Sequence, residues 1–285
     1  MPVDAVTRPW SRNALVAALV FLAATAPLRA QNTAPAAPEA NDVAIALVLA
    51  VDTSGSVSSQ RFELQKQGYA AAFRNPQVLN SIRSLATQSI AVTMMQWTGP
   101  RLHVVVAEWT RIKDEASANA FAATIETVPR QLFGGGTSIS GAIDFSRLLL
   151  AQSPFSAARR VIDISGDGSN NSGRAVTQAR DEAVADGIGI NGLPILALEP
   201  GLDRYYYDNV IGGPGAFVIP AENYDNFADA VLKKLITEIA GPTPRRSLAS
   251  DAVSAPRSQA RPTWRPSFAA AKLPNSIISM SETPR

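Results

Sequence analysis

The stretch VAIALVLAVDTSGS, residues 43–56, changes abruptly from an apolar run to a polar loop. Nine consecutive apolar residues without polar alternation are typical of a strand that is covered on both faces of a sheet. The loop that follows places Asp52, Ser54 and Ser56 at every second position. Residues with this spacing point the same way in an extended segment, and Gly55 allows the backbone to bend between the serines. The stretch therefore predicts a buried strand that ends in a cluster of oxygen atoms.

Apolar runs and helical patterns alternate along the chain after this strand. Five further strands are predicted at 89–97, 102–109, 159–165, 190–198 and 216–220. Helical spacing of apolar residues predicts helices at 59–74, 114–128, 138–152, 173–187 and 223–240. The short turn TGPR between the second and third strands predicts an antiparallel hairpin. The predicted fold is α/β and doubly wound, with a mostly parallel six-stranded sheet, one antiparallel edge strand and helices on both faces.

Composition divides the chain into four segments. Residues 1–30 begin with a positive segment that holds Arg8 and Arg12, continue with an apolar run and end in the small residue Ala30, which is typical of an export signal cleaved near that position. Retention of the same run as a membrane anchor is the alternative. Residues 31–42 are expected to form an Ala/Pro-rich linker, residues 43–240 the folded domain, and residues 241–285 a disordered Pro/Ser/Arg-rich tail. We therefore expect an exported protein, periplasmic or secreted, which has no cysteine and so forms no disulfide.

The basic character of the chain belongs to the tail. The whole chain has a net charge of +2 and a pI near 9.0. Residues 43–240 hold 16 Lys and Arg against 19 Asp and Glu, whereas residues 241–285 hold 7 against 2. A mildly acidic domain argues against a nucleic-acid partner. The basic tail can contact an anionic envelope surface or simply keep the chain soluble.

Two further loops are expected at the same edge of the sheet as Asp52. Thr137 follows three glycines in FGGGTSISG and precedes a helix, and Asp167 follows a buried strand in ISGDGSNN. Ligands of open α/β sheets bind beyond the carboxyl ends of the strands, where the strand order reverses. Carboxylates and hydroxyls are hard donors that suit Mg²⁺, Mn²⁺ or Ca²⁺. The candidate metal ligands are Asp52, Ser54, Ser56, Thr137 and Asp167.

These three loops together resemble the von Willebrand factor A domain in the form that carries a metal-ion-dependent adhesion site. DTSGS matches the family's Asp-x-Ser-x-Ser motif, GGGTS matches its Gly-Gly-Thr loop, and GDGSNN is similar to its Asp-Gly loop. Gly166 departs from the family, which usually has Thr immediately before the aspartate. The resemblance covers about residues 43–240 and extends to an uncharacterised group of exported bacterial proteins built on this domain.

The resemblance implies a binding module rather than an enzyme. The chain would supply most ligands of one divalent cation, Mg²⁺ first and Ca²⁺ or Mn²⁺ as alternatives, and leave one position open. An Asp or Glu of a partner protein would complete the shell. Three neutral hydroxyls leave the cation short of negative charge, which favours an incoming carboxylate.

Other interpretations of the same residues stay open at this point. The hydroxyls of Ser54, Ser56 and Thr137 could cap helices, and Asp163 competes with Asp167 as a ligand, although its position within a strand favours a structural carboxylate. A subtilisin-like protease would use Asp52, His103 and Ser138, which occur in the required chain order. The residues around His103 and after Ser138 do not follow the protease pattern. A scaffold with a vestigial site is the third alternative.

Overall fold

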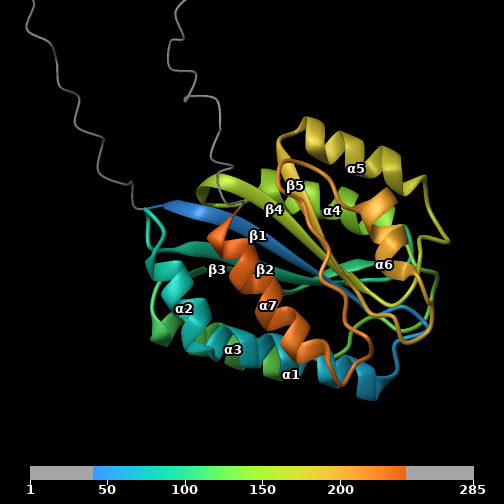
Figure 1. The fold of residues 1–285 in the computed structure, drawn as a ribbon, viewed down its shortest axis with the longest axis horizontal. Helices are drawn as coiled ribbons and strands as arrows, with labels where there is room; N and C mark the ends of the chain where they lie inside the picture. Colours follow the sequence, from blue (N-terminus) through green and yellow to red (C-terminus); the bar gives the residue numbers. More distant parts are fainter. Residues whose placement is uncertain (1–40, 242–285) are drawn as a thin grey trace, which may run out of the picture. The chain divides into compact units, whose positions relative to one another are not determined.

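The computed structural model describes residues 41–241, in which helices cover both faces of a central sheet (Figure 1). The expected export signal, almost all of the expected linker and the expected tail lie outside the described residues. The elements in chain order are β1 (Asp42–Asp52), α1 (Ser59–Arg74), α2 (Pro76–Arg83), β2 (Ile90–Trp97), β3 (His103–Ile112), α3 (Glu115–Thr127), α4 (Ile139–Ala151), β4 (Ser156–Gly166), α5 (Val176–Ala185), β5 (Ile188–Pro194), α6 (Leu202–Tyr205), the π-helical η1 (Tyr206–Val210) and α7 (Phe227–Ala240).

The five strands lie in the order β3-β2-β1-β4-β5. The central strand β1 is parallel to β2 on one side and to β4 on the other, and β4 is parallel to β5. Only the edge strand β3 is antiparallel, and it pairs with β2 through the predicted hairpin. The predicted α/β fold with a mostly parallel sheet and one antiparallel edge strand is confirmed. The chain leaves β1 toward β2 and later returns to β4, so the strand order reverses beside β1.

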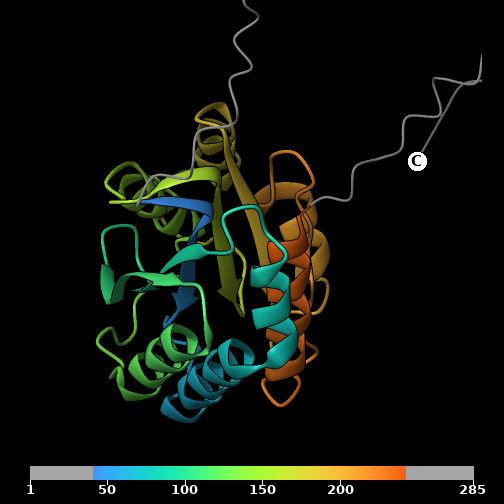
Figure 2. The same cartoon turned by 90° about the vertical axis from the view of Figure 1, so that its left-hand side faces the viewer.

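The uninterrupted apolar sequence of β1 follows from its central position, because successive side chains point to opposite faces of the sheet. Leu47 and Leu49 belong to the core shared with α1, α2, α3 and α7. Val48 and Ala50 belong to the core shared with α4, α5, α6 and η1. Figures 1 and 2 show these two helical layers on either side of the sheet. Both cores bury β1, and their packing fixes the loop that leaves its carboxyl end.

The prediction of a sixth strand at 216–220 is wrong. Val218 forms an isolated bridge to Gly192 of β5, and Ala221, which follows the segment, forms one to Ile195, which follows β5. Gly192 N–H donates to Phe217 O at 3.1 Å, and Ala221 N–H donates to Pro194 O at 2.9 Å. Pro194 has no N–H, so the hydrogen bond between these two points cannot form. The ladder is interrupted there, and β5 ends at Pro194 rather than at residue 198.

The sequence patterns missed helix α2 entirely. Asn75 is its N-cap, with a side chain that accepts a hydrogen bond from Gln77 N–H at 2.8 Å, and Pro76 occupies the first helical position. An Asn-Pro pair before Val78, Leu79 and Ile82, all buried, is a start signal that could have revealed it. The helix packs with α1 and α7 and extends the cover of that face of the sheet.

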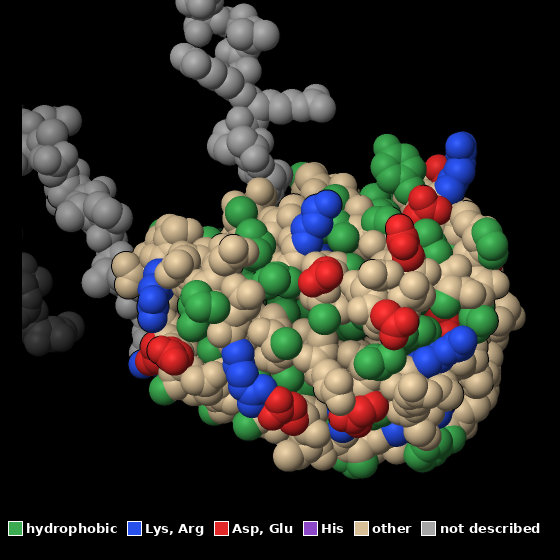
Figure 3. All heavy atoms as spheres, turned by 60° about the horizontal axis from the view of Figure 1, so that its bottom comes forward, with side chains coloured by type: hydrophobic (Ala, Val, Ile, Leu, Met, Phe, Trp, Pro, Cys, Tyr) green, Lys and Arg blue, Asp and Glu red, His purple; other side chains and the backbone are tan. Residues whose placement is uncertain are grey.

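The helical face seen from below carries charges of both signs. Figure 3 shows Lys and Arg side chains interspersed with Asp and Glu on this face, without a continuous area of one sign. Arg74 of α1 pairs with Glu126 of α3, and Lys66 lies 2.9 Å from Glu63. Within residues 41–241, no helix is both long enough and apolar enough to cross a bilayer.

Candidate metal site

The predicted ligands lie together at the carboxyl edge of the sheet. Asp52 ends β1, and Asp167 follows the last residue of β4, which runs parallel to β1. Ser54 and Ser56 occupy the loop from β1 to α1, and Thr137 precedes α4. Asp52, Ser54 and Asp167 are buried, whereas Ser56 is exposed, so the group opens to the surface at Ser56.

Hydrogen bonds join four of the five predicted residues. Asp52 Oδ1 accepts from Ser54 N–H at 2.7 Å, and the hydroxyls of Ser54 and Ser56 lie 3.1 Å apart. The Ser56 hydroxyl donates to Asp167 Oδ1 at 2.5 Å. The alternating spacing in the sequence therefore does place a carboxylate and two hydroxyls in one small volume, with the second carboxylate beside them.

The carboxyl group of Asp52 is buried and has a raised pKa. Its side chain is fully buried, and its Oδ2 has no hydrogen-bond partner among the described residues. Burial raises the pKa of the Asp52 carboxyl to about 7, the negative charge of Asp167 adds to the rise, and the Ser54 N–H opposes it. Gly166 allows this close packing, because a Cβ at that position would lie 3.0 Å from Asp52 Oδ2 and 3.0 Å from the Tyr206 hydroxyl. The glycine that departs from the family pattern therefore has a structural reason.

Two residues that the sequence patterns missed hold the other oxygen of Asp167. The Tyr224 hydroxyl donates to Asp167 Oδ2 at 2.8 Å, and Arg61 Nη1 lies 3.6 Å from the same atom. Arg61 belongs to the first turn of α1, and Tyr224 precedes α7. No local motif marks either residue, because both reach Asp167 only through the tertiary fold.

Thr137 lies on a neighbouring loop that packs against the loop of Asp167. Its N–H donates to Asn171 Oδ1 at 2.8 Å, and Asn171 N–H donates to Thr137 O at 2.9 Å. A Cβ on Gly168 would lie 3.7 Å from the Thr137 hydroxyl. In the described part of the chain, no hydrogen bond joins this hydroxyl to the other four predicted residues. The Thr137 side chain therefore lies beside the hydrogen-bonded cluster of the other four predicted residues but makes no hydrogen bond to it.

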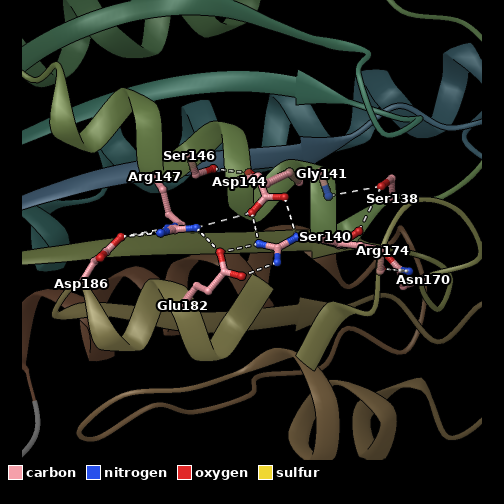
Figure 4. Close-up of polar contacts among 11 residues, drawn as sticks. Ser138, Ser140, Gly141, Asp144, Ser146, Arg147, Asn170, Arg174, Glu182 and Asp186 are labelled. Carbon is pink, nitrogen blue, oxygen red and sulfur yellow. Dashed lines mark hydrogen bonds and ion pairs between the residues drawn. The ribbon is translucent and has the colours of Figure 1, made fainter. Parts of the chain in front are cut away.

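An ion-pair network fixes the two helices behind these loops. Figure 4 shows Arg147 and Arg174 among three acidic side chains, from Asp144 of α4, Glu182 of α5 and Asp186 at the end of α5. Arg174 lies 2.6 Å from Asp144 and 2.5 Å from Glu182, and Arg147 lies 2.7 Å from Asp186. The network joins α4, which begins shortly after Thr137, to α5, which begins after the loop of Asp167.

The structure gives less support to the alternative interpretations, in which the predicted hydroxyl ligands cap helices, Asp163 is a ligand or His103 is catalytic. Ser58 caps α1 and Ser138 caps α4, so none of the three predicted hydroxyl ligands is the N-cap of these helices. Asp163 is buried and lies 2.8 Å from Lys234 Nζ, so its carboxylate already has a cationic partner within the fold. His103 stacks on Phe145, with ring centroids 5.0 Å apart.

The protease residues form no hydrogen-bonded relay. His103 Nε2 is buried without a hydrogen-bond partner among residues 41–241. The Ser138 hydroxyl accepts from Gly141 N–H at 3.2 Å, and the bonded oxygen of Asp52 accepts from the Ser54 N–H. A triad requires the histidine to contact both other members, so this arrangement does not support the protease alternative.

The chemistry of the group fits a hard divalent cation. No set of three or more His, Cys, Asp or Glu side chains within the described residues could hold a metal. A cation at Asp52 would therefore need hydroxyl ligands in addition to the two carboxylates, which is typical of Mg²⁺ and Ca²⁺ rather than of zinc in structural sites. A buried carboxylate oxygen without a partner is costly, and a cation would remove that cost.

Several solved structures share this arrangement of sheet and helices. Proximal thread matrix protein 1 from the mussel byssus matches with a TM-score of 0.52 and 13% identity, over 70% of this chain and 49% of that one. A von Willebrand factor type A structure from Catenulispora acidiphila matches with a TM-score of 0.50 and 15% identity, over 70% and 43%. The pilus adhesin SpaC from Lactobacillus rhamnosus GG matches with a TM-score of 0.50 and 15% identity, over 70% and 31%.

The chain thus has a von Willebrand factor A-like fold and spans about half of the mussel protein. One structure of that mussel protein is described with a zinc-occupied MIDAS motif, the metal-ion-dependent adhesion site. Within this fold class, the chain belongs to the family described as "Protein of unknown function (DUF1194)", whose model matches residues 42–243. The comparison with curated proteins finds no match.

Proposed function

We propose that this chain is an exported module that binds a partner protein through a divalent cation. Mg²⁺ is the expected ion, with Ca²⁺ or Mn²⁺ as alternatives. An Asp or Glu of the partner would complete the ligand shell. The observation that carries the proposal is the buried Oδ2 of Asp52, which lies next to two hydroxyls and a second carboxylate and has no hydrogen-bond partner among residues 41–241. The residues that would hold the cation are Asp52, Ser54, Ser56, Thr137 and Asp167.

The proposed ligands divide into charged and neutral members. Asp52 and Asp167 supply two negative charges, and the three hydroxyls supply oxygen atoms without charge. A bound cation would offer the partner's carboxylate a Lewis-acidic position. Ser56 is the exposed member of the group, and it therefore marks the side from which a partner can approach.

A role in adhesion or assembly is favoured over catalysis. The fold is shared with a pilus adhesin and a byssus matrix protein, and the protease residues do not contact one another as a relay would require. We place the module at residues 43–240, after an export signal at 1–30 and a linker at 31–42, in the periplasm or outside the cell. The basic tail at 241–285 would make at most weak contacts with anionic envelope surfaces.

Thermal unfolding of the full chain with Mg²⁺, Ca²⁺ or Mn²⁺ tests the proposal. A ligand at about 100 times its Kd stabilises the folded state by about 2.7 kcal/mol, which corresponds to a rise of roughly 5–10 °C in Tm for a domain of this size. We expect this rise in the wild type and its loss in Asp52→Asn. Asn keeps the shape of the side chain but removes the charge that a cation needs.

Asp181→Asn is the matched control, because this exposed aspartate lies on α5 beside Arg180, away from the site. The control should keep the full rise in Tm. No rise with any of the three cations would overturn the proposal. A Mg²⁺-dependent pull-down from envelope extract, with chelator and Asp52→Asn as references, would then identify the partner.

A further inference from the structure

Arg61 lies at the edge of the proposed metal site in a fixed orientation. Its Nη1 donates to Ser56 O at 2.8 Å and lies 3.6 Å from Asp167 Oδ2. Its guanidinium lies over the Tyr224 ring, 5.2 Å from the centroid, and Tyr224 itself donates to Asp167 Oδ2. The loop before α1, the loop after β4 and the segment before α7 thus hold one guanidinium beside Asp167.

Part of this guanidinium faces outward. All polar contacts that the Arg61 side chain makes with other described residues run through Nη1. The side chain is 30% exposed. A guanidinium carries five N–H donors in a planar fork that matches the geometry of a carboxylate. The N–H groups on Nη2 and Nε are therefore free to donate hydrogen bonds to an oxygen atom from outside the domain.

The charges around the site are not balanced without an incoming anion. Asp52 and Asp167 would neutralise a divalent cation between them, and Arg61 then leaves one positive charge in excess. Two further charges lie nearby: Arg130 donates to Ser54 O at 3.1 Å, and Glu199 accepts from the Ser169 N–H at 2.8 Å. These two have opposite signs, so the excess of one positive charge remains.

We propose that Arg61 is a second contact for the partner's acidic residue. One oxygen of that carboxylate would bind the cation, and the other would accept hydrogen bonds from Arg61. This inference rests on the proposed function and deepens it, because it names the residue of this chain that would select a carboxylate over a neutral oxygen donor such as an amide. A guanidinium makes an ion pair and two parallel hydrogen bonds with a carboxylate, whereas a neutral amide oxygen carries no charge to pair with it, so Arg61 favours aspartate or glutamate over asparagine or glutamine.

Under this proposal, Arg61→Gln changes the affinity for Mg²⁺ and the affinity for the partner's carboxylate in opposite directions. Removal of a positive charge beside the site lowers the repulsion of a cation, so we expect Mg²⁺ to bind roughly threefold more tightly. Removal of the guanidinium donors takes away one contact of the carboxylate, so we expect an aspartate ligand to bind about tenfold more weakly. If Arg61 only supported the loop structure, its loss would weaken both.

The experiment uses the full chain and two blocked tripeptides, acetyl-Gly-Asp-Gly-amide and acetyl-Gly-Asn-Gly-amide. Calorimetry measures the Kd of Mg²⁺ alone, and NMR titration at saturating Mg²⁺ measures the Kd of each peptide. Arg74→Gln is the matched control. It makes the same change in the last turn of the same helix, about 20 Å away, where Arg74 pairs with Glu126.

Each possible result either supports or overturns the proposed role of Arg61. Tighter Mg²⁺ binding, weaker binding of the aspartate peptide and a lost preference over the asparagine peptide in Arg61→Gln alone would support it. Unchanged peptide binding, or a parallel loss of Mg²⁺ and peptide affinity, would overturn the role of Arg61 and leave the metal-dependent function standing. A wild type that binds none of Mg²⁺, Ca²⁺ and Mn²⁺ would overturn both.

Discussion

Lys234 on α7 is a buried cation, and its replacement by methionine tests how this fold stabilises a buried carboxylate. Its Nζ lies 2.8 Å from Asp163 Oδ1 and 3.6 Å from Glu238 Oε2, and none of the three residues is more than 2% exposed. The same Nζ lies 5.3 Å from the centroid of the Phe217 ring. Lys234→Met keeps an unbranched chain of similar length but leaves two buried carboxylates without their cation.

The pKa of Asp163 sets the size and the pH dependence of the effect. Burial raises this pKa from 3.8 to about 6, although Lys234 lowers it, and the net rise corresponds to about 3 kcal/mol. A carboxyl with a raised pKa in the folded state contributes stability at low pH that is lost as the pH rises through the folded pKa. Without Lys234 the pKa of Asp163 in the folded state rises further, so the folded state loses more stability as the pH increases. We expect a cost of about 3–5 kcal/mol at pH 8 and a clearly smaller cost at pH 5, where Asp163 is protonated.

Urea unfolding of the full chain in the presence of chelator, at pH 8 and at pH 5, measures both values. Lys233→Met is the matched control, because Lys233 is the exposed neighbour on the same helix, and we expect it to change the free energy of unfolding by less than about 0.5 kcal/mol. A cost for Lys234→Met that is equal at the two pH values, or larger at pH 5, would refute the reasoning.

Two further predictions concern the site and the network behind it. Gly166→Ala places a Cβ 3.0 Å from Asp52 Oδ2, so we expect a loss of about 1–3 kcal/mol in urea unfolding and a smaller rise in Tm with Mg²⁺. Gly99→Ala, whose Cβ meets Leu102 Cδ1 at 3.4 Å, serves as the control, and equal losses in both variants would contradict the argument. Hydrogen bonds from Arg174 and then Arg147 lower the pKa of Glu182 to about 2, so its contribution to stability is present above pH 4.5 and is lost as the pH falls toward 2. We expect the Tm of Glu182→Gln to fall less steeply over this range than that of the wild type, and parallel curves would show that Glu182 does not contribute.

Local patterns were sufficient to predict most of the fold. The apolar run of β1 and the helical spacing of α1 are properties of short segments, and they gave the alternation of strands and helices that defines the sheet. The sixth strand was wrong for a reason that lies outside its own residues. Its apolar sequence is compatible with a strand, but the neighbouring Pro194 cannot donate to it.

The candidate site was predictable to the extent that its residues end strands or precede a helix. Asp52 and Asp167 follow adjacent parallel strands, so strand order alone brings them together. Arg61 and Tyr224 were not predictable. Tyr224 lies 57 positions from Asp167, and Arg61 is one of several charged residues on a helix. Their contacts exist only because α1 and the segment before α7 approach the same loop.

The two buried aspartates of the sheet explain why we propose an external cation for one of them and not for the other. Asp163 lies within β4 and Asp52 at the end of β1, and burial raises the pKa of both carboxyls. The fold supplies Asp163 with Lys234, whereas the free oxygen of Asp52 meets no cationic group among the described residues. A buried carboxylate needs a positive partner or must stay protonated. Asp52 lies at the open edge of the sheet, next to two hydroxyls, so a cation from solution can reach it where no side chain of the domain does.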